Sequence, residues 1–104
     1  MSFFSRLFGA PDVPSAVPSP DQDRELVLYK FDSCPYCVRV MVKAKALGLE
    51  LEMRDTRRDR AHHEEMVKRT GRTQVPLLFI DGQPLWESAD INAWLTAYAS
   101  RSPA

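Results

Sequence analysis

The sequence lacks the cysteines that most secreted, disulfide-stabilised domains and structural zinc sites require. Its only two cysteines are Cys34 and Cys37, and the two residues between them are too few for a disulfide that joins distant parts of the chain. Two thiolates cannot complete a tetrahedral zinc site alone. The adjacent His62 and His63 would point about 100° apart on a helix, so both rarely reach one metal. We therefore expect no bound metal.

The chain also lacks a net charge and a long apolar run. Fourteen basic residues balance fourteen acidic ones, which differs from the one-sided basic surface of nucleic-acid-binding domains. No segment approaches the ~20 apolar residues that span a bilayer, and nothing resembles a signal peptide. We expect no nucleic-acid partner and a cytoplasmic location, where two neighbouring thiols are more often catalytic than structural.

The first 23 residues differ in composition from the rest. Prolines at positions 11, 14, 18 and 20 fix backbone angles and remove hydrogen-bond donors. We predict that residues 1–23 form a disordered, proline-rich extension and that residues 24–104 form one domain, which we expect to be monomeric. The apolar cluster Phe3, Phe4, Leu7 and Phe8 has two interpretations: a weak membrane or partner contact, or simply part of the disordered tail. The second is favoured, because one short apolar segment binds membranes poorly.

Within the domain, the apolar residues alternate between strand-like and helical spacing. The predicted strands cover residues 26–31, 49–53, 77–80 and 83–86, and the predicted helices cover 36–47, 60–70 and a segment that begins after an N-cap at Ser88. The first two strands are joined through a helix and the last two through the Asp81-Gly82 turn. This order predicts an α/β fold, a four-stranded mixed β-sheet flanked by α-helices.

Cys34 stands where the first predicted strand ends and a helix begins. A helix start has unpaired N–H groups and a partial positive charge, which favour a thiolate, and Pro35 suits the first helical turn. We therefore predict that the pKa of Cys34 is lowered and that Cys34 is the attacking sulfur. Cys37 lies almost one turn deeper and is predicted to be less exposed and to act second, as the resolving thiol.

Two motifs resemble those of dithiol glutaredoxins. Cys34-Pro35-Tyr36-Cys37 is similar to the family's active-site motif, and residues 70–82, with Val75-Pro76 before a strand, are similar to its second signature. The resemblance covers roughly residues 24–100. It implies a thioredoxin fold with Pro76 in the cis form. It also implies a glutathione-dependent oxidoreductase that reduces protein–glutathione mixed disulfides and protein disulfides.

The resemblance further implies where glutathione binds. The Val75 backbone would pair with the cysteinyl part, and Arg72 would meet the glycyl carboxylate. Ser88 would bind the γ-glutamyl carboxylate at a helix start, and Glu87 or Asp90 would accept from the amino group. The other predicted contacts are Tyr36, Gln74 and Pro76. The alternatives are a surface role for Arg72, ordinary capping by Ser88, and helix-dipole compensation by Asp90.

The chain departs from the family pattern at two places near this site. Many glutaredoxins have Gly-Gly before the last helix, whereas here the Glu87-Ser88 pair is similar to the glutathione-binding segment of glutathione transferases, which share the fold. A lysine often stands three residues before the first cysteine, but that position is Phe31. Lys30, one step earlier on a strand, points to the opposite face. The helix start must therefore carry more of the thiolate stabilisation.

Two other functions remain open from the sequence. One is an iron–sulfur cluster carrier in which Cys34 and glutathione provide the ligands, although Pro35 stiffens the loop where a cluster would fit. The other is a non-catalytic binding module whose tail contacts a membrane or a partner. Thiol–disulfide exchange with glutathione is the function that the motifs favour.

Overall fold

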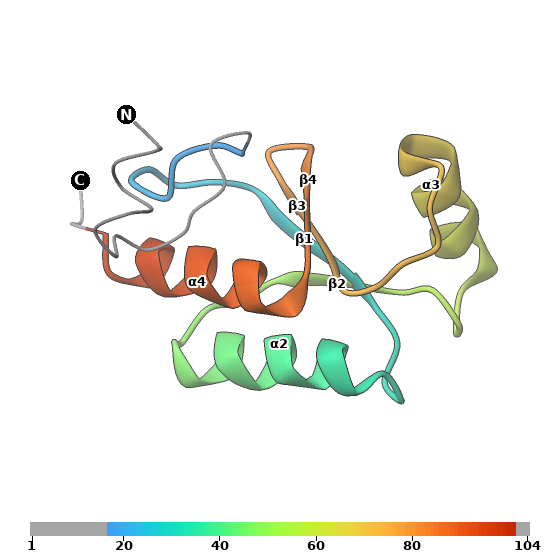
Figure 1. Cartoon of the computed structure of the whole chain (residues 1–104), viewed down its shortest axis with the longest axis horizontal. Helices are drawn as coiled ribbons and strands as arrows, with labels where there is room; N and C mark the ends of the chain where they lie inside the picture. Colours follow the sequence, from blue (N-terminus) through green and yellow to red (C-terminus); the bar gives the residue numbers. More distant parts are fainter. Residues whose placement is uncertain (1–16, 102–104) are drawn as a thin grey trace.

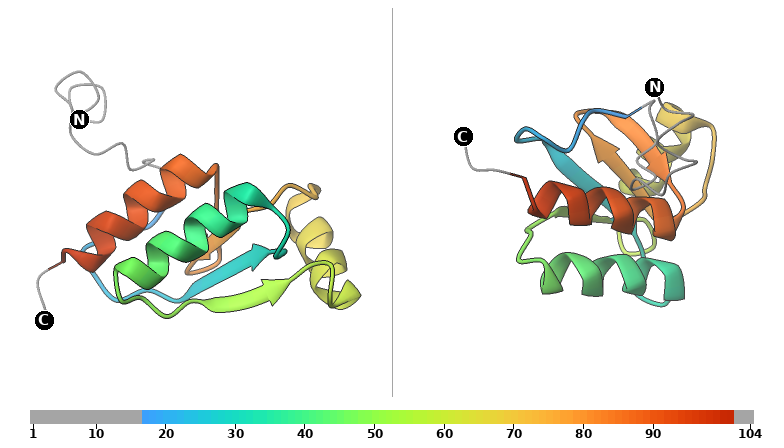
Figure 2. Two further views of the ribbon diagram at one scale, coloured as in Figure 1. Left: turned by 90° about the horizontal axis from the view of Figure 1, so that it is seen from below. Right: turned by 60° about the vertical axis from the view of Figure 1, so that its left-hand side comes forward.

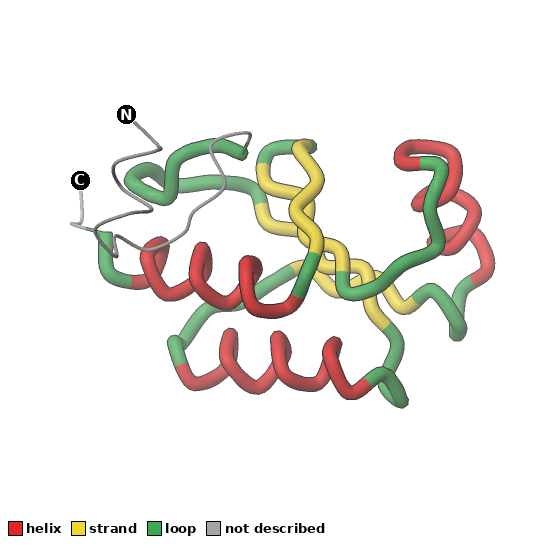
Figure 3. Tube along the Cα trace, viewed as in Figure 1, coloured by secondary structure: helices red, strands yellow, loops and turns green. Residues whose placement is uncertain are grey.

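The domain is a four-stranded sheet with helices on both faces (Figures 1 and 3). A computed structural model describes residues 17–101. The elements are β1 (Leu26–Lys30), α2 (Pro35–Ala46), β2 (Glu52–Asp55), α3 (Arg60–Thr70), β3 (Leu77–Ile80), β4 (Gln83–Trp86) and α4 (Ser88–Ala99). The strand order is β2-β1-β3-β4, with β1 parallel to β2 and the other two pairs antiparallel. This confirms the predicted mixed sheet and element order, which are those of the thioredoxin fold.

The sheet separates two groups of buried side chains. Helices α2 and α4 lie side by side on one face (Figure 2), where they cover Leu26 and Leu28 of β1. Val27 and Tyr29 point to the other face, where α3 contributes Met66. Successive residues of a strand point to opposite faces, so a strand covered on both sides is apolar throughout. This explains the continuous apolar runs of β1 and β3.

The second strand lies later in the chain than predicted. The alternating pattern predicted residues 49–53, but β2 covers Glu52–Asp55 and pairs in register from Val27 with Glu52 to Lys30 with Asp55. Leu49 and Leu51 instead pack against the core beneath α2 and α4. The alternation of apolar residues therefore reflects burial of Leu49 and Leu51 in the segment before the strand. The residues that form β2 are instead those that hydrogen-bond with β1.

Residues 17–23 contact the domain, so packing begins before the predicted start at residue 24. The Trp94 indole Nε1 donates to the Pro18 carbonyl at 2.9 Å, and Val17 packs against the core beneath α2 and α4. Arg101, which follows helix α4, forms an ion pair with Asp23. The apolar cluster at residues 3–8 lies outside the described residues. Across residues 17–101, no helix has the length and apolar character to cross a membrane.

We predict that Trp94→Phe lowers the free energy of unfolding by about 1–2 kcal/mol, because it removes the donor to the partly buried Pro18 carbonyl. Urea denaturation followed by circular dichroism measures this change. In a chain that begins at Asp21, the same substitution should cost clearly less, since the acceptor is gone. Equal losses in the two backgrounds would show that this hydrogen bond does not attach the segment.

Candidate functional site

Cys34 is the N-cap of helix α2, as the sequence predicted. Its backbone is extended (φ −83°, ψ 116°), Pro35 occupies the first helical turn, and the Cys34 Sγ accepts the Cys37 N–H at 3.4 Å. One of the unpaired N–H groups of the helix start is therefore directed at the sulfur. This N-capping position is normally occupied by a serine, threonine or aspartate oxygen. Here a sulfur takes the place of that oxygen.

The two cysteines differ in burial. The Cys34 residue is 7% exposed and Cys37 is 0% exposed. Burial, followed by the hydrogen bond with Cys34, raises the pKa of the Cys37 thiol well above its ordinary value. Cys37 is therefore a protonated thiol at neutral pH. The prediction that Cys37 is the less exposed of the two is confirmed.

A cavity of about 560 Å³ adjoins the first turns of α2 and α4. Six of the residues predicted from the sequence line it: Tyr36, Gln74, Val75, Pro76, Glu87 and Ser88. The Val75–Pro76 peptide bond is cis, as predicted. Three segments that are far apart in the chain thus meet next to the helix that Cys34 caps.

The start of helix α4 differs from the prediction. The N-cap is Glu87, not Ser88, and Glu87 has a positive φ of 70°. Its side chain makes no capping bond, and Ser88 is the buried first residue of the helix. The left-handed backbone at Glu87 turns the chain directly from β4 into α4, which places Ser88 inside the helix and one position too late to cap it.

A chain of hydrogen bonds connects the two sides of the cavity. The Arg72 guanidinium donates to the Gln74 carbonyl oxygen Oε1, and Gln74 Nε2 donates to Glu87 Oε1 at 3.2 Å. The Arg72 Cζ also lies 4.2 Å from the centroid of the Trp86 ring. Arg72 is therefore linked to the cavity through Gln74, but it is not among the lining residues. Asp90, in the first turn of α4, does not line the cavity either.

The lysine next to the motif is occupied by other contacts. Lys30 Nζ lies 2.6 Å from Asp32 Oδ1 and 3.4 Å from Asp55 Oδ2. The hydrogen bond with Asp32 contributes most to the raised pKa of Lys30, against its burial. Its ammonium is thus held by two carboxylates.

Sequence reasoning did not identify Arg39 or Ala89, which also line the cavity. Arg39 lies one helical turn after Tyr36, and its Cζ is 5.7 Å from the centroid of that ring. Helical spacing from Tyr36 was the signal that could have found it. Within the part of the chain that the structure describes, no group of three or more His, Cys, Asp or Glu side chains is placed to hold a metal ion.

We predict that iodoacetamide at neutral pH modifies Cys34 and spares Cys37, because Cys37 is buried and protonated. Since its pKa is raised, the Cys37 thiolate should appear only as the pH rises above the range of ordinary thiols, and its alkylation should increase in that direction. Peptide mass spectrometry measures both sites, with urea-unfolded protein as the control in which both react. Equal labelling of the two cysteines in the folded protein at neutral pH would contradict the assignment.

Comparison with known proteins agrees with this geometry. The glutaredoxin family model matches residues 26–85. Glutaredoxin 3 of Escherichia coli K12 is 36% identical over 66 residues, which cover 64% of this chain and 80% of that protein.

Two solved structures have a fold similar to that of this chain. A glutathione transferase homologue of Drosophila mojavensis with bound glutathione has a TM-score of 0.64 and 25% identity, over 75% of this chain and 37% of its own. The chain thus spans little more than a third of that transferase's length. Oxidized glutaredoxin 2 of Chlamydomonas reinhardtii has a TM-score of 0.56 and 22% identity, over 70% of this chain and 72% of its own, and shows the fold alone. With the family match over residues 26–85, the chain belongs to the glutaredoxin family, the glutathione-dependent thiol oxidoreductases.

Proposed function

We propose that Cys34 is the nucleophile that reduces protein–glutathione mixed disulfides. The observation that carries this assignment is the position of its sulfur. The Cys34 Sγ caps helix α2 and accepts the Cys37 N–H, while Cys37 is fully buried and has a raised pKa. Of the two thiols, only Cys34 therefore combines some exposure with an N–H donor that stabilises the anion.

The proposed reaction consists of two thiol–disulfide exchanges. The Cys34 thiolate attacks the glutathione sulfur of the mixed disulfide, a Cys34–glutathione disulfide forms, and the protein leaves as a thiolate that takes a proton from water. A second glutathione, as its thiolate, then attacks the glutathione sulfur of this intermediate. The products are oxidised glutathione and the Cys34 thiolate. Each cycle therefore oxidises one free glutathione thiol as the protein sulfur is reduced, and the glutathione of the mixed disulfide becomes the other half of the oxidised glutathione.

Protein disulfides follow a branch that uses Cys37. Cys34 attacks one sulfur of the substrate, and Cys37 then attacks Cys34, which releases the reduced protein and leaves a Cys34–Cys37 disulfide. Once Cys34 is in a disulfide, its hydrogen bond and charge no longer oppose ionisation of Cys37, so loss of the Cys37 proton becomes easier. Two glutathione molecules then reduce the internal disulfide.

Glutathione is proposed to lie in the cavity, with its cysteinyl part beside the Val75 backbone, between Tyr36, Gln74 and Pro76. Its γ-glutamyl carboxylate meets the N–H groups and hydroxyl at Ser88, where no N-cap side chain competes. Glu87, which lines the cavity, is favoured over Asp90 as the acceptor for the amino group. Arg72 reaches the glycyl carboxylate from its place beside Gln74. The glutathione bound to the Drosophila homologue supports a tripeptide in this fold.

We further propose that the protein works as a monomer in the cytoplasm on glutathionylated and disulfide-containing proteins. The two closely spaced thiols of the sequence favour a reducing compartment. For the rival iron–sulfur function, the first helical turn is the relevant feature. Pro35 stands there and stiffens the segment in which Cys34 would have to ligate a cluster.

We predict that Cys34→Ser abolishes the reduction of a glutathionylated peptide, whereas Cys37→Ser retains most of it, because only the first thiol enters that cycle. With a protein disulfide as substrate, both variants should lose activity. A glutathione-dependent assay coupled to oxidised-glutathione formation measures the rates. An active Cys34→Ser variant would refute the nucleophile assignment, and a brown purified protein that loses its colour in this variant would favour the iron–sulfur carrier.

We predict that Glu87→Gln raises the KM for glutathione by about fivefold with a smaller change in kcat, because it removes a charged acceptor for the substrate amino group. Steady-state kinetics with varied glutathione measure the two constants. Glu64→Gln is the matched control, since Glu64 pairs with Arg60 on α3 and does not line the cavity. If both variants keep the original KM, the amino group is bound elsewhere.

A further inference from the structure

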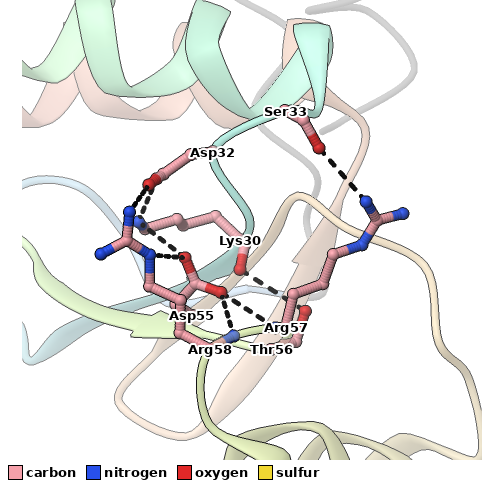
Figure 4. Close-up of polar contacts among 7 residues, drawn as sticks. All are labelled: Lys30, Asp32, Ser33, Asp55, Thr56, Arg57 and Arg58. Atoms are coloured by element: carbon pink, nitrogen blue, oxygen red, sulfur yellow. Dashed lines mark hydrogen bonds and ion pairs between the residues drawn. The ribbon is translucent and has the colours of Figure 1, made fainter.

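A cluster of charged side chains lies where β1 and β2 end, just before Cys34 (Figure 4). Lys30 is held by Asp32 and Asp55, as described above. Arg58 pairs with the same two carboxylates: its Nη2 lies 3.0 Å from Asp32 Oδ2, and its Nε lies 3.7 Å from Asp55 Oδ2. Two cations and two anions thus neutralise each other, which leaves the fifth charged member of the cluster, Arg57.

Arg57 points away from these ion pairs. Figure 4 shows its side chain extending toward Ser33, while Arg58 extends in the other direction toward Asp32. Among residues 17–101, no carboxylate lies within ion-pair distance of Arg57. Its guanidinium carbon lies 3.7 Å from the centroid of the Phe31 ring, and Nη1 donates to Ser33 Oγ at 3.2 Å. Arg57 is therefore an exposed cation without a counter-ion in the described structure.

The position of Arg57 is fixed from both ends. Asp55 Oδ1 accepts the backbone N–H of Arg57 at 2.9 Å and that of Arg58 at 2.8 Å. Burial opposes the charge of Asp55, but these bonds and Lys30 lower its pKa, so this turn persists at neutral pH. At the other end, the Phe31 ring and the Ser33 hydroxyl hold the guanidinium. A cation held in this way loses little conformational freedom when it binds an anion.

Arg57 lies on the side of Cys34 away from the cavity. The segment that carries Cys34 follows β1, which has β2 on one side and β3 on the other. Arg57 follows β2, and its partner Ser33 directly precedes Cys34. The cavity, in contrast, is lined by Val75 and Pro76 before β3 and by Glu87 after β4. A disulfide presented to Cys34 therefore has the cavity on one side and Arg57 on the other.

A guanidinium has five N–H donors in a planar fork that fits a carboxylate, and Arg57 uses Nη1 to bind Ser33. The proposed function already provides for both carboxylates of glutathione, at Ser88 and at Arg72. We propose that Arg57 binds a carboxylate of the protein joined to glutathione, so that the enzyme prefers mixed disulfides whose cysteine has acidic neighbours. This inference rests on the proposed function, in which Cys34 attacks such a disulfide.

The test uses glutathionylated peptides that differ only beside the cysteine, with aspartate, glutamine or lysine in the flanking positions. For the full-length protein, we expect kcat/KM to be about fivefold higher for the aspartate peptide than for the glutamine peptide. The lysine peptide should be the poorest substrate. This ratio should fall toward one as the salt concentration rises, because the contact is exposed.

Substitutions assign the preference to Arg57. Arg57→Gln should reduce the aspartate-to-glutamine ratio to about one, and Arg57→Lys, which retains the charge, should keep part of it. Arg60→Gln is the matched control, since it removes another exposed arginine, which is paired with Glu64, and should leave the ratio as it was. A wild-type ratio of one, or a ratio that survives Arg57→Gln, would overturn the inference.

Two further readouts separate this inference from its alternatives. If Arg57→Gln raises the KM for glutathione equally with all three peptides, Arg57 binds the tripeptide and the inference is wrong. Turnover of the glutamine peptide by the wild-type protein tests the proposed function on its own. Turnover that depends on Cys34 and glutathione, but shows no preference among peptides, would overturn only the inference. No turnover of any peptide would overturn the proposed function.

Discussion

The hydrogen bond from the Cys37 N–H to the Cys34 sulfur is the contact on which the site depends. It places a sulfur at the N-cap position, where a helix normally has a side-chain oxygen. Cys37, three residues later in the same helical turn, is fully buried. One short segment thereby gives two identical side chains different surroundings. The outer sulfur has an N–H donor and belongs to a residue that is 7% exposed, whereas the inner one is fully buried and its pKa is raised.

The sheet order determines what surrounds this sulfur. Because β1 is an inner strand, the segment that follows it has neighbours on both sides. On the β3 and β4 side, the cis Val75–Pro76 bond and the start of α4 form the cavity proposed for glutathione. On the β2 side, the loop before α3 brings Arg57 against Phe31. A central position in the sheet thus places the segment that carries Cys34 between two separate surfaces.

The charged side chains near the site are of two kinds: those in ion pairs and those that lie near aromatic rings. Lys30, Arg58, Asp32 and Asp55 neutralise one another and fix the loops that carry them. Arg39, Arg57 and Arg72 instead lie near aromatic rings, which hold a guanidinium without neutralising its charge. A protein with no net charge can therefore keep cationic side chains near Cys34 and the cavity.

The sequence alone was sufficient for the element order, the position of Cys34 at the start of a helix and most of the residues that line the cavity. The first two depend on apolar periodicity, and the cavity residues were inferred from short motifs that resemble those of glutaredoxins and glutathione transferases. Both kinds of signal are local along the chain. The register of β2, the contact of Pro18 with Trp94, the capping position at Glu87 and the surroundings of Arg57 became evident only in the tertiary structure. Each depends on a backbone angle or on which distant segment lies nearby, and neither is encoded in the spacing of residues within one segment.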